Sequence, residues 1–96
     1  MAHYVVLANF TEQGIRGVKE TTQRARAFRD VADGMGVKVK DIYWTLGLYD
    51  VILTMEAPHD EAVASLMMKV GSLGNLTSHT LRAFDEAEVT SLLSKV

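Results

Sequence analysis

Hydrophobic and polar residues change their spacing several times along the chain, and each change marks a predicted element. Residues 3–10 are rich in Tyr, Val, Leu and Phe on both alternating faces. This pattern is typical of a strand that is covered on both sides, in the middle of a sheet. From residue 15 or 18 to about residue 35, apolar residues return every three or four positions, which predicts an amphipathic helix. Gly34 or Gly36 ends this helix.

The second predicted strand covers residues 37–46 and begins with Val-Lys-Val-Lys. Lysines that alternate with valines are typical of an edge strand. The alternation changes phase near Lys40 and Asp41, because the apolar residues after this point occupy the other parity. Either a β-bulge or covering of both faces of the strand explains the change.

A β-hairpin is predicted at the centre of the chain. Gly47 interrupts the strand-favouring residues and allows the backbone angles of a tight reversal. Tyr49 and Asp50 then lie at or just after the turn, and a third strand follows over residues 50–57.

The second half of the chain predicts a helix, a strand and a short terminal helix. Pro58 begins a helix whose first turn carries two acidic residues, which the helix dipole favours there. Gly74 or Asn75 ends it. Residues 76–84 form the fourth predicted strand, and residues 85–96 form a terminal helix with one apolar side.

The order strand, helix, strand, strand, helix, strand predicts an α+β protein of the ferredoxin-like type. Right-handed crossovers place both main helices on one face of the antiparallel sheet and leave the other face bare. If Val51, Leu53 and Met55 point at the helices, the bare face carries a mixture of apolar and polar residues. These are Val5, Leu7, Tyr43, Thr45, Asp50, Ile52, Thr54, Glu56, Thr80 and Arg82. We expect a second copy of the chain to cover this face, since a standard interface removes about 800 Å² per partner, which is about the area of such a sheet face.

Composition narrows the classes of function. A chain of 96 residues forms one domain, residues 1–96, and its net charge of −2 does not indicate nucleic-acid binding. The chain contains no cysteine, which excludes disulfides and thiolate chemistry. No signal-peptide pattern and no apolar run of about 20 residues is present, so we expect a cytoplasmic protein that does not bind membranes.

Five segments together resemble the GYD-domain family. They are Thr11-Glu12-Gln13-Gly14-Ile15-Arg16, the run from Tyr43 to Asp50, Glu56-Ala57-Pro58, Leu73-Gly74-Asn75 and Arg82-Ala83-Phe84. The family name describes the turn Gly-x-Tyr-Asp, here Gly47, Tyr49 and Asp50. The resemblance covers nearly the whole chain and implies a dimeric α/β-barrel association, in which ferredoxin-like domains pair sheet against sheet. It supplies no catalytic residues. Residues 21–23 depart from the family pattern, which has a proline in this stretch.

Five residues are candidates for binding a ligand: Tyr43, Tyr49, Asp50, His79 and Arg82. A guanidinium can bind an anion with two parallel hydrogen bonds, and a phenol or carboxylate near the turn can face a ligand. In the structural alternative, the Asp50 carboxylate accepts backbone N–H bonds or pairs with Arg82. Trp44, Met67 and Met68 are predicted in the core, where the Met pair would line a pocket between helix and sheet.

Histidine chemistry is the second possibility. His3 and His79 fall on neighbouring strands and could act as acid and base, whereas His59 falls at a helix start. The scattered histidines show no metal-ligand spacing, so neither a metal nor a cofactor is expected. The sequence therefore favours a non-catalytic, homo-oligomeric module for ligand binding or interaction. The alternatives are a cofactor-independent isomerase or cyclase that uses His and Tyr, and a heme-handling monooxygenase.

Overall fold

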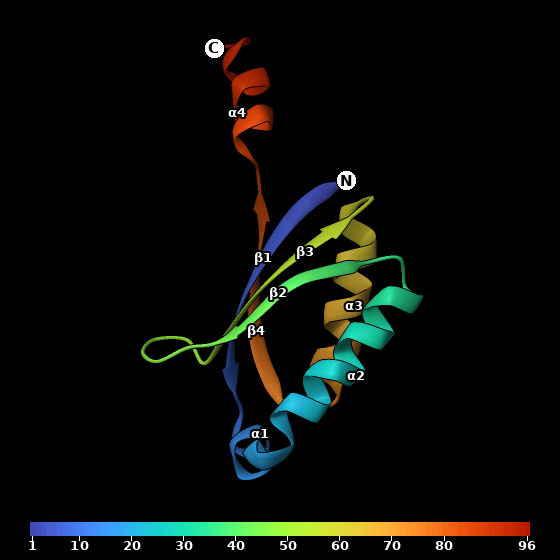
Figure 1. The fold of residues 1–96 in the computed structure, drawn as a ribbon, viewed down its shortest axis with the longest axis vertical. Helices are drawn as coiled ribbons and strands as arrows, with labels where there is room; N and C mark the ends of the chain where they lie inside the picture. The colour runs from blue at the N-terminus through green and yellow to red at the C-terminus, as the bar shows by residue number, and fades with distance from the viewer.

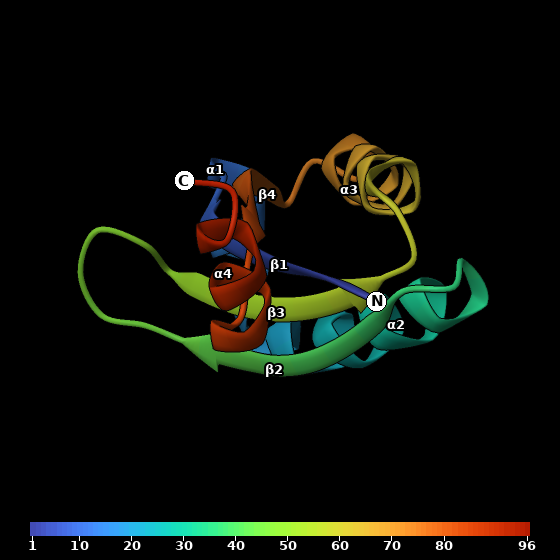
Figure 2. The same ribbon diagram turned by 90° about the horizontal axis from the view of Figure 1, so that it is seen from above.

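A four-stranded antiparallel sheet carries two helices on one of its faces (Figures 1 and 2). The computed structural model describes all residues, 1–96. Its elements in chain order are β1 (Ala2–Phe10), α1 (Glu12–Arg16), the 3₁₀ helix η1 (Val18–Glu20), α2 (Thr21–Gly34), β2 (Lys38–Trp44), β3 (Val51–Ala57), α3 (Asp60–Ser72), β4 (Leu76–Ala83) and α4 (Glu86–Leu93). The strand order is β2-β3-β1-β4, so β1 lies inside the sheet as its apolar pattern predicted. The predicted ferredoxin-like α+β fold is confirmed.

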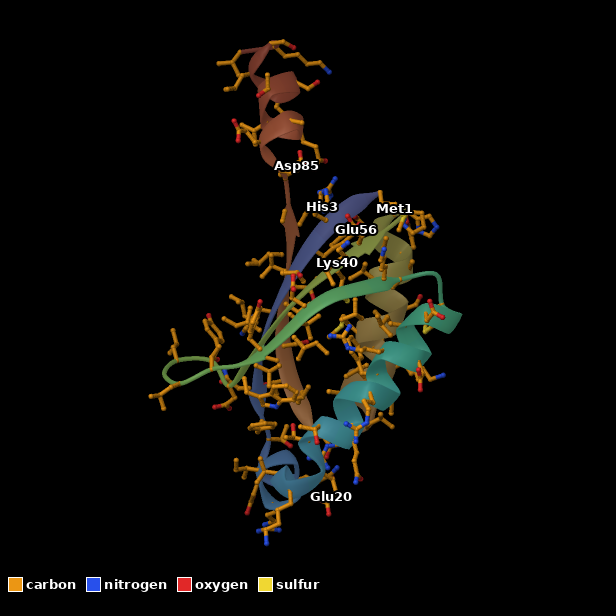
Figure 3. The ribbon with its side chains drawn as sticks, viewed as in Figure 1. Met1, His3, Glu20, Lys40, Glu56 and Asp85 are labelled. Carbon is orange, nitrogen blue, oxygen red and sulfur yellow. The ribbon has the colours of Figure 1, made fainter.

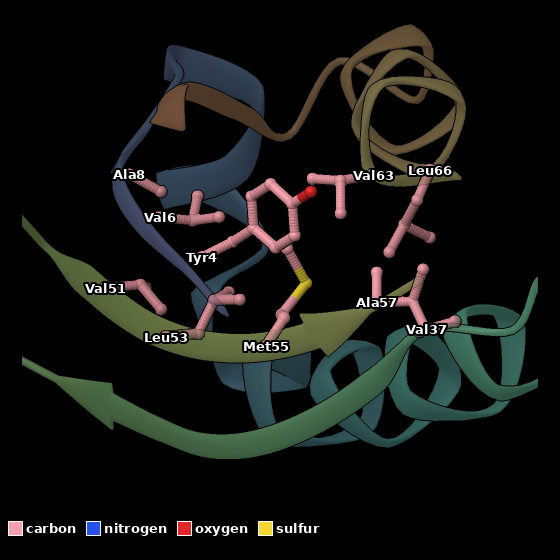
Figure 4. Packing of buried hydrophobic residues seen from close by; sticks show 11 residues of the cluster. Tyr4, Val6, Ala8, Val37, Val51, Leu53, Met55, Ala57, Val63 and Leu66 are labelled. Carbon is pink, nitrogen blue, oxygen red and sulfur yellow. The ribbon is translucent and has the colours of Figure 1, made fainter. Parts of the chain in front are cut away.

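The hydrophobic core lies between the sheet and the helices (Figure 4). Every second residue of β1 and β3 is buried on this side, and α3 adds two buried side chains. The buried residues of these three elements are Tyr4, Val6, Ala8, Val51, Leu53, Met55, Ala57, Val63 and Leu66. The alternation in the strands and the helical period of α3 therefore point their apolar residues at one another.

The first predicted helix is not continuous, and this prediction was wrong. Three pieces, α1, η1 and α2, replace the single helix expected between residues 15 and 35. Thr11 caps α1, since its hydroxyl accepts a hydrogen bond from the Gly14 backbone N–H at 3.0 Å. Gly17 then separates α1 from η1 and leaves Val18 exposed, outside the apolar stripe of α2.

The edge strand β2 contains the predicted irregularity. Its pairing with β3 shifts between Val39 and Asp41, so the change of phase comes from a β-bulge. The lysines that flank Val39 are exposed, as expected for a strand with one free edge.

The β2–β3 connection is longer than the predicted tight turn. Six residues, 45–50, form a loop that projects from the sheet (Figure 1). The Thr45 backbone N–H donates to the Asp50 carbonyl at 2.8 Å and closes the base of the loop. Gly47 adopts a positive φ of 127°, a conformation that side chains disfavour.

In strand β4, the residues that face the helices are the ones predicted to face the bare side of the sheet. Thr80 pairs with Val6 and Arg82 pairs with Tyr4, so both share the helix-facing side of the sheet rather than the bare side. The strand has only two large apolar residues, Leu76 and Leu81, and these stand on opposite faces. Its hydrophobic pattern therefore could not determine which face turns inward.

The terminal helix α4 extends past the end of the sheet (Figure 1). A capping box starts it: the Asp85 carboxylate accepts from the Glu88 N–H at 2.8 Å, and the Glu88 carboxylate accepts from the Asp85 N–H at 3.1 Å. The apolar side predicted for this helix, including Leu92 and Leu93, is exposed. The chain thus does not cover its own sheet with its tail.

Candidate functional site

The sheet face opposite α2 and α3, called here the open face, carries no helix (Figure 2). Strand pairing arranges its side chains in three rows, each running from β2 through β3 and β1 to β4. The first row is Tyr43, Ile52, Leu7 and His79; the second is Asp41, Thr54, Val5 and Leu81; the third is Lys38, Glu56, His3 and Ala83. The first row lies nearest the β2–β3 loop, and the third lies nearest α4.

The rows differ in polarity. The first row is mainly apolar, and Tyr43 at its β2 end is 61% exposed. The second row contains a polar pair in which the Thr54 hydroxyl donates to the Asp41 carboxylate at 2.9 Å. An apolar patch beside polar, internally paired groups has the composition of a protein interface with a polar rim.

A charged cluster surrounds the third row and joins the sheet to α4 (Figure 3). The His3 ring lies 3.3 Å from the Asp85 carboxylate, 3.5 Å from that of Glu88 and 3.6 Å from that of Glu56. Lys40 Nζ adds a contact to Glu56 at 3.8 Å. Ligand atoms of His3, Asp85 and Glu88 lie within 4.8 Å of one another, so these residues could hold a cation. The two carboxylates also form the capping box of α4, which gives them a structural role.

Sequence reasoning missed this cluster, although one signal for it was present. The Asp-x-x-Glu spacing of residues 85–88 is that of a helix-capping pair. The antiparallel partner of His3 is Ala83, two residues before this pair. This register, which the sequence does not give, places the ring beside the cap.

Two leucines at the tip of the β2–β3 loop form a second exposed apolar feature. Leu46 and Leu48 flank Gly47 and are 104% and 82% exposed. Large side chains so fully exposed on a projecting loop gain nothing from the fold of the chain itself, so they are available for contacts with another molecule.

The predicted ligand residues of the turn hold the loop in place. The Asp50 carboxylate accepts from the Phe10 N–H at 3.0 Å, and the Asp50 N–H donates to the Ala8 carbonyl at 3.0 Å. The structural alternative of backbone bonding is thus confirmed for Asp50, and its proposed pairing with Arg82 is wrong. Tyr49 is half-buried, and its carbonyl accepts a hydrogen bond from the Thr45 hydroxyl.

Tyr43 and His79 stand at opposite ends of the first row of the open face. His3 shares this face with His79, but His79 pairs with Leu7, four residues along β1. The two positions are therefore about 13 Å apart along the strands, at roughly 3.3 Å per residue, too far for the side chains to act as an acid–base pair. The isomerase or cyclase alternative requires His3 or His79 within hydrogen-bond reach of Tyr or Asp in a closed apolar cavity. His3 lies 3.3 Å from Asp85, but its side chain is 32% exposed, and His79 is exposed on the sheet.

Arg82, the fifth predicted residue, lies on the other face of the sheet, in a shallow pocket with Tyr4 and Asp60. Its guanidinium stands 5.6 Å from the Tyr4 ring and 4.4 Å from the Phe84 ring, and contacts the Glu88 carboxylate at 3.5 Å. The Tyr4 hydroxyl donates to the Asp60 carboxylate. Burial raises the pKa of Tyr4, and the hydrogen bond to Asp60 raises it further. At neutral pH this phenol is therefore a proton donor.

An apolar cavity lies between α2, α3 and the sheet, where the sequence placed a pocket. Trp44 and Met67 line it, whereas Met68 is 76% exposed, which corrects its predicted core position. Trp44 is not in the closed core either, since it is 44% exposed. None of the three histidines lines this cavity, so it lacks the histidine that a heme-handling monooxygenase would need.

The fold and the open face define a small ferredoxin-like protein whose sheet is covered on one side only. None of its helices combines the length and the apolar character that spanning a membrane requires. The model of the GYD domain matches residues 4–93, and the chain therefore belongs to the GYD-domain family.

Three comparisons extend this assignment. A protein of Thermus thermophilus named "Glutamine synthetase and cystathionine beta-lyase binding protein" is 28% identical over 94 residues, which cover 97% of this chain and 99% of the relative. The crystal structure of TTHA0845, also from Thermus thermophilus, superposes with a TM-score of 0.58 at 20% identity over 88% of this chain and 95% of that one. The crystal structure of MtbAldR (Rv2779c) gives a TM-score of 0.69 at 17% identity over 88% of this chain. This chain spans about half of MtbAldR, 52% of its length. Both structures show likeness of fold.

Proposed function

We propose that this protein is a homo-oligomeric protein-interaction module whose open face pairs with a second copy of the chain. The observation that carries the proposal is the apolar first row of the open face, which no element of the same chain covers. Two copies related by a two-fold axis would each bury the same patch, as in most symmetric dimers. In this arrangement, Tyr43 and His79 belong to the pairing surface.

The size of the sheet limits how such a dimer can form. Four strands about 4.8 Å apart, with eight paired residues in the longest ladder, β1–β4, give a face of roughly 19 by 26 Å. This flat outline of about 500 Å² is smaller than expected from the sequence, because a standard interface removes about 800 Å² of accessible surface from each partner. We infer that α4 adds to the contact, because its exposed side chains Val89, Leu92 and Leu93 lie beyond the end of the sheet.

The second part of the proposal is that the module binds a metabolic enzyme. Its support is the name of the relative from Thermus thermophilus, which aligns with nearly the whole chain. The loop tip with Leu46 and Leu48 is the surface we assign to this contact. Apolar side chains that project from a loop can fill a pocket of a partner and carry much of its affinity.

The dimer is tested by size-exclusion chromatography with light scattering at micromolar concentration. The unmodified protein should have twice the mass of one chain. Leu7→Glu places a charge in the apolar first row of the open face and should give a folded monomer. Thr22→Glu, on the exposed side of α2, serves as the control and should remain a dimer. A monomeric unmodified protein, or a dimer that survives Leu7→Glu, would refute the pairing.

Enzyme binding is tested by biolayer interferometry with purified glutamine synthetase and cystathionine β-lyase from the organism that encodes this protein. Binding of either enzyme should weaken at least about tenfold with Leu48→Asp, as expected for an anchor residue worth more than about 1.4 kcal/mol. Thr22→Glu again serves as the control and should bind normally. If neither enzyme binds, this part of the proposal fails, while the light-scattering result judges the dimer separately.

A further inference from the structure

The cavity between α2, α3 and the sheet, called here the interhelical cavity, lies on the side away from the open face. Figure 2 shows α2 and α3 apart from each other on the same side of the sheet. Fifteen of its nineteen lining residues are hydrophobic. The sheet contributes residues such as Val6 and Leu53, α2 contributes Phe28, and α3 contributes Met67 and Val70. The cavity is therefore apolar on all three sides.

The cavity has the volume of a small ring compound. It measures about 180 Å³. For comparison, an engineered apolar cavity of about 150 Å³ stays dry and binds benzene. Water gains few hydrogen bonds against such walls, so an apolar group would replace it favourably.

Four polar residues line the cavity: Thr21, Arg24, Lys69 and Asn75. The two that are charged, Arg24 and Lys69, are both positive. Neither Arg24 nor Lys69 forms an ion pair within the chain, and no acidic residue lines the cavity.

Two backbone carbonyls, in α1 and just after it, hold the Arg24 guanidinium. Its Nη2 donates to the Gly17 carbonyl at 2.7 Å and lies 3.4 Å from the Gly14 carbonyl. The first turn of α2 and the last turns of α3 lie at the same end of the molecule, next to α1 (Figure 1). Arg24 and Lys69 thus line the cavity from the ends of the two helices that lie together, where a negative group of a ligand would be favoured.

We propose that the interhelical cavity binds a small carboxylate with an aromatic or branched aliphatic body. The apolar body lies between the helices, and the carboxylate faces Arg24 and Lys69. This combination of an apolar pocket with a few convergent polar groups is the usual form of a small-molecule site. The proposal is independent of the interaction module, since the cavity and the open face lie on opposite sides of the sheet.

Trp44 supplies a direct readout because it lines the cavity and is the only tryptophan of the chain. Its indole N–H donates to the Thr21 hydroxyl at 3.0 Å, which holds the ring at the cavity wall. The probes are 3-phenylpropionate and its neutral counterpart, 3-phenylpropan-1-ol, which has the same apolar body. Titration of each at low ionic strength should change the Trp44 emission to a saturating value, with the acid binding at least about fivefold more tightly.

Lys69→Met separates the charge from the apolar contact. Lys69 is exposed, so this variant should fold, and it should bind the acid about fivefold more weakly while it binds the alcohol unchanged. Lys19→Met removes an exposed cation outside the cavity and should change neither affinity. The assignment would be overturned by titrations that do not saturate with either probe. It would also be overturned by an affinity for the acid that only equals that for the alcohol, or that Lys69→Met leaves unchanged.

Discussion

Substitution of Gly14 tests the packing of α1 against the turn between α3 and β4. Gly14 is buried in α1, and a Cβ added to it would lie 2.0 Å from the Asn75 carbonyl oxygen and 3.0 Å from its carbon. Ordinary van der Waals contact begins at 3.4 Å, so the new methyl group is about 1.4 Å too close to the backbone. Because the obstacle is backbone, α1 and the turn must move apart.

The separation breaks specific hydrogen bonds. The Thr11 N–H donates to the Asn75 carbonyl at 3.1 Å, and the Gln13 side chain donates to the Leu73 carbonyl at 2.9 Å. Loss of one or both costs about 1 kcal/mol each, and overpacking adds about 1–3 kcal/mol. We therefore expect Gly14→Ala to lower the free energy of unfolding by about 2–5 kcal/mol. For a domain of this size, this corresponds to a melting temperature lower by roughly 10–25 °C.

Gly34→Ala is the matched control for this experiment. Gly34 also lies in a helix, at the end of α2, but nothing lies within 4 Å of its added Cβ. Alanine should stabilise the protein there by up to about 1 kcal/mol, since it loses less backbone entropy on folding. Thermal melts followed by circular dichroism measure both variants. A Gly14→Ala protein that melts at or above the unmodified protein would refute the packing argument.

Two further predictions concern buried polar contacts. Asp50→Ala removes the acceptor of the Phe10 N–H and should lower the free energy of unfolding, measured by urea denaturation, by about 1–2 kcal/mol. Asp50→Asn keeps an acceptor oxygen and should lower it less. Equal losses in the two variants would contradict the hydrogen-bond role. Tyr4 has a folded-state pKa above its ordinary value of 10.0, so as the pH rises past about 10 the unfolded chain releases this proton first and stability falls. Tyr4→Phe, which leaves Tyr43 and Tyr49 in place, should lose stability less steeply between pH 9 and about 11; identical slopes would contradict the shift.

The parts of the fold that sequence could predict are those where hydrophobic spacing and burial agree. Strand β1 is apolar on both faces and lies inside the sheet, and β3 alternates regularly and buries every second residue. The change of phase in β2 was also visible in the sequence, which left a bulge and covering of both faces as alternatives; the pairing register shows the bulge.

The errors arose where the determining contact is distant in sequence. The helical period does not reveal that α1 ends at Gly17 and packs Gly14 against Asn75, a neighbour sixty-one residues away. The parity of β4 failed for a different reason. Arg82 and Thr80 lie at the edge of the core beside α3, in an open pocket. A polar side chain can face the helices there and still contact solvent.

Candidate site residues were harder to predict than the fold. A Tyr-Asp pair after a turn has the same appearance whether it binds a ligand or the backbone, and Asp50 binds the backbone. The cations of the interhelical cavity, Arg24 and Lys69, stand in helices whose patterns show solvated faces, so nothing local marks them as neighbours of one cavity.

The two free edges of the sheet are not equivalent. The bulge in β2 and its flanking lysines disturb the regular row of N–H and C=O groups that another strand would need. Strand β4 has neither device, and its eight residues pair without a shift along β1. Any extended peptide that lengthens this sheet would therefore join it along β4, so a search for strand-type binding partners should begin at residues 76–83.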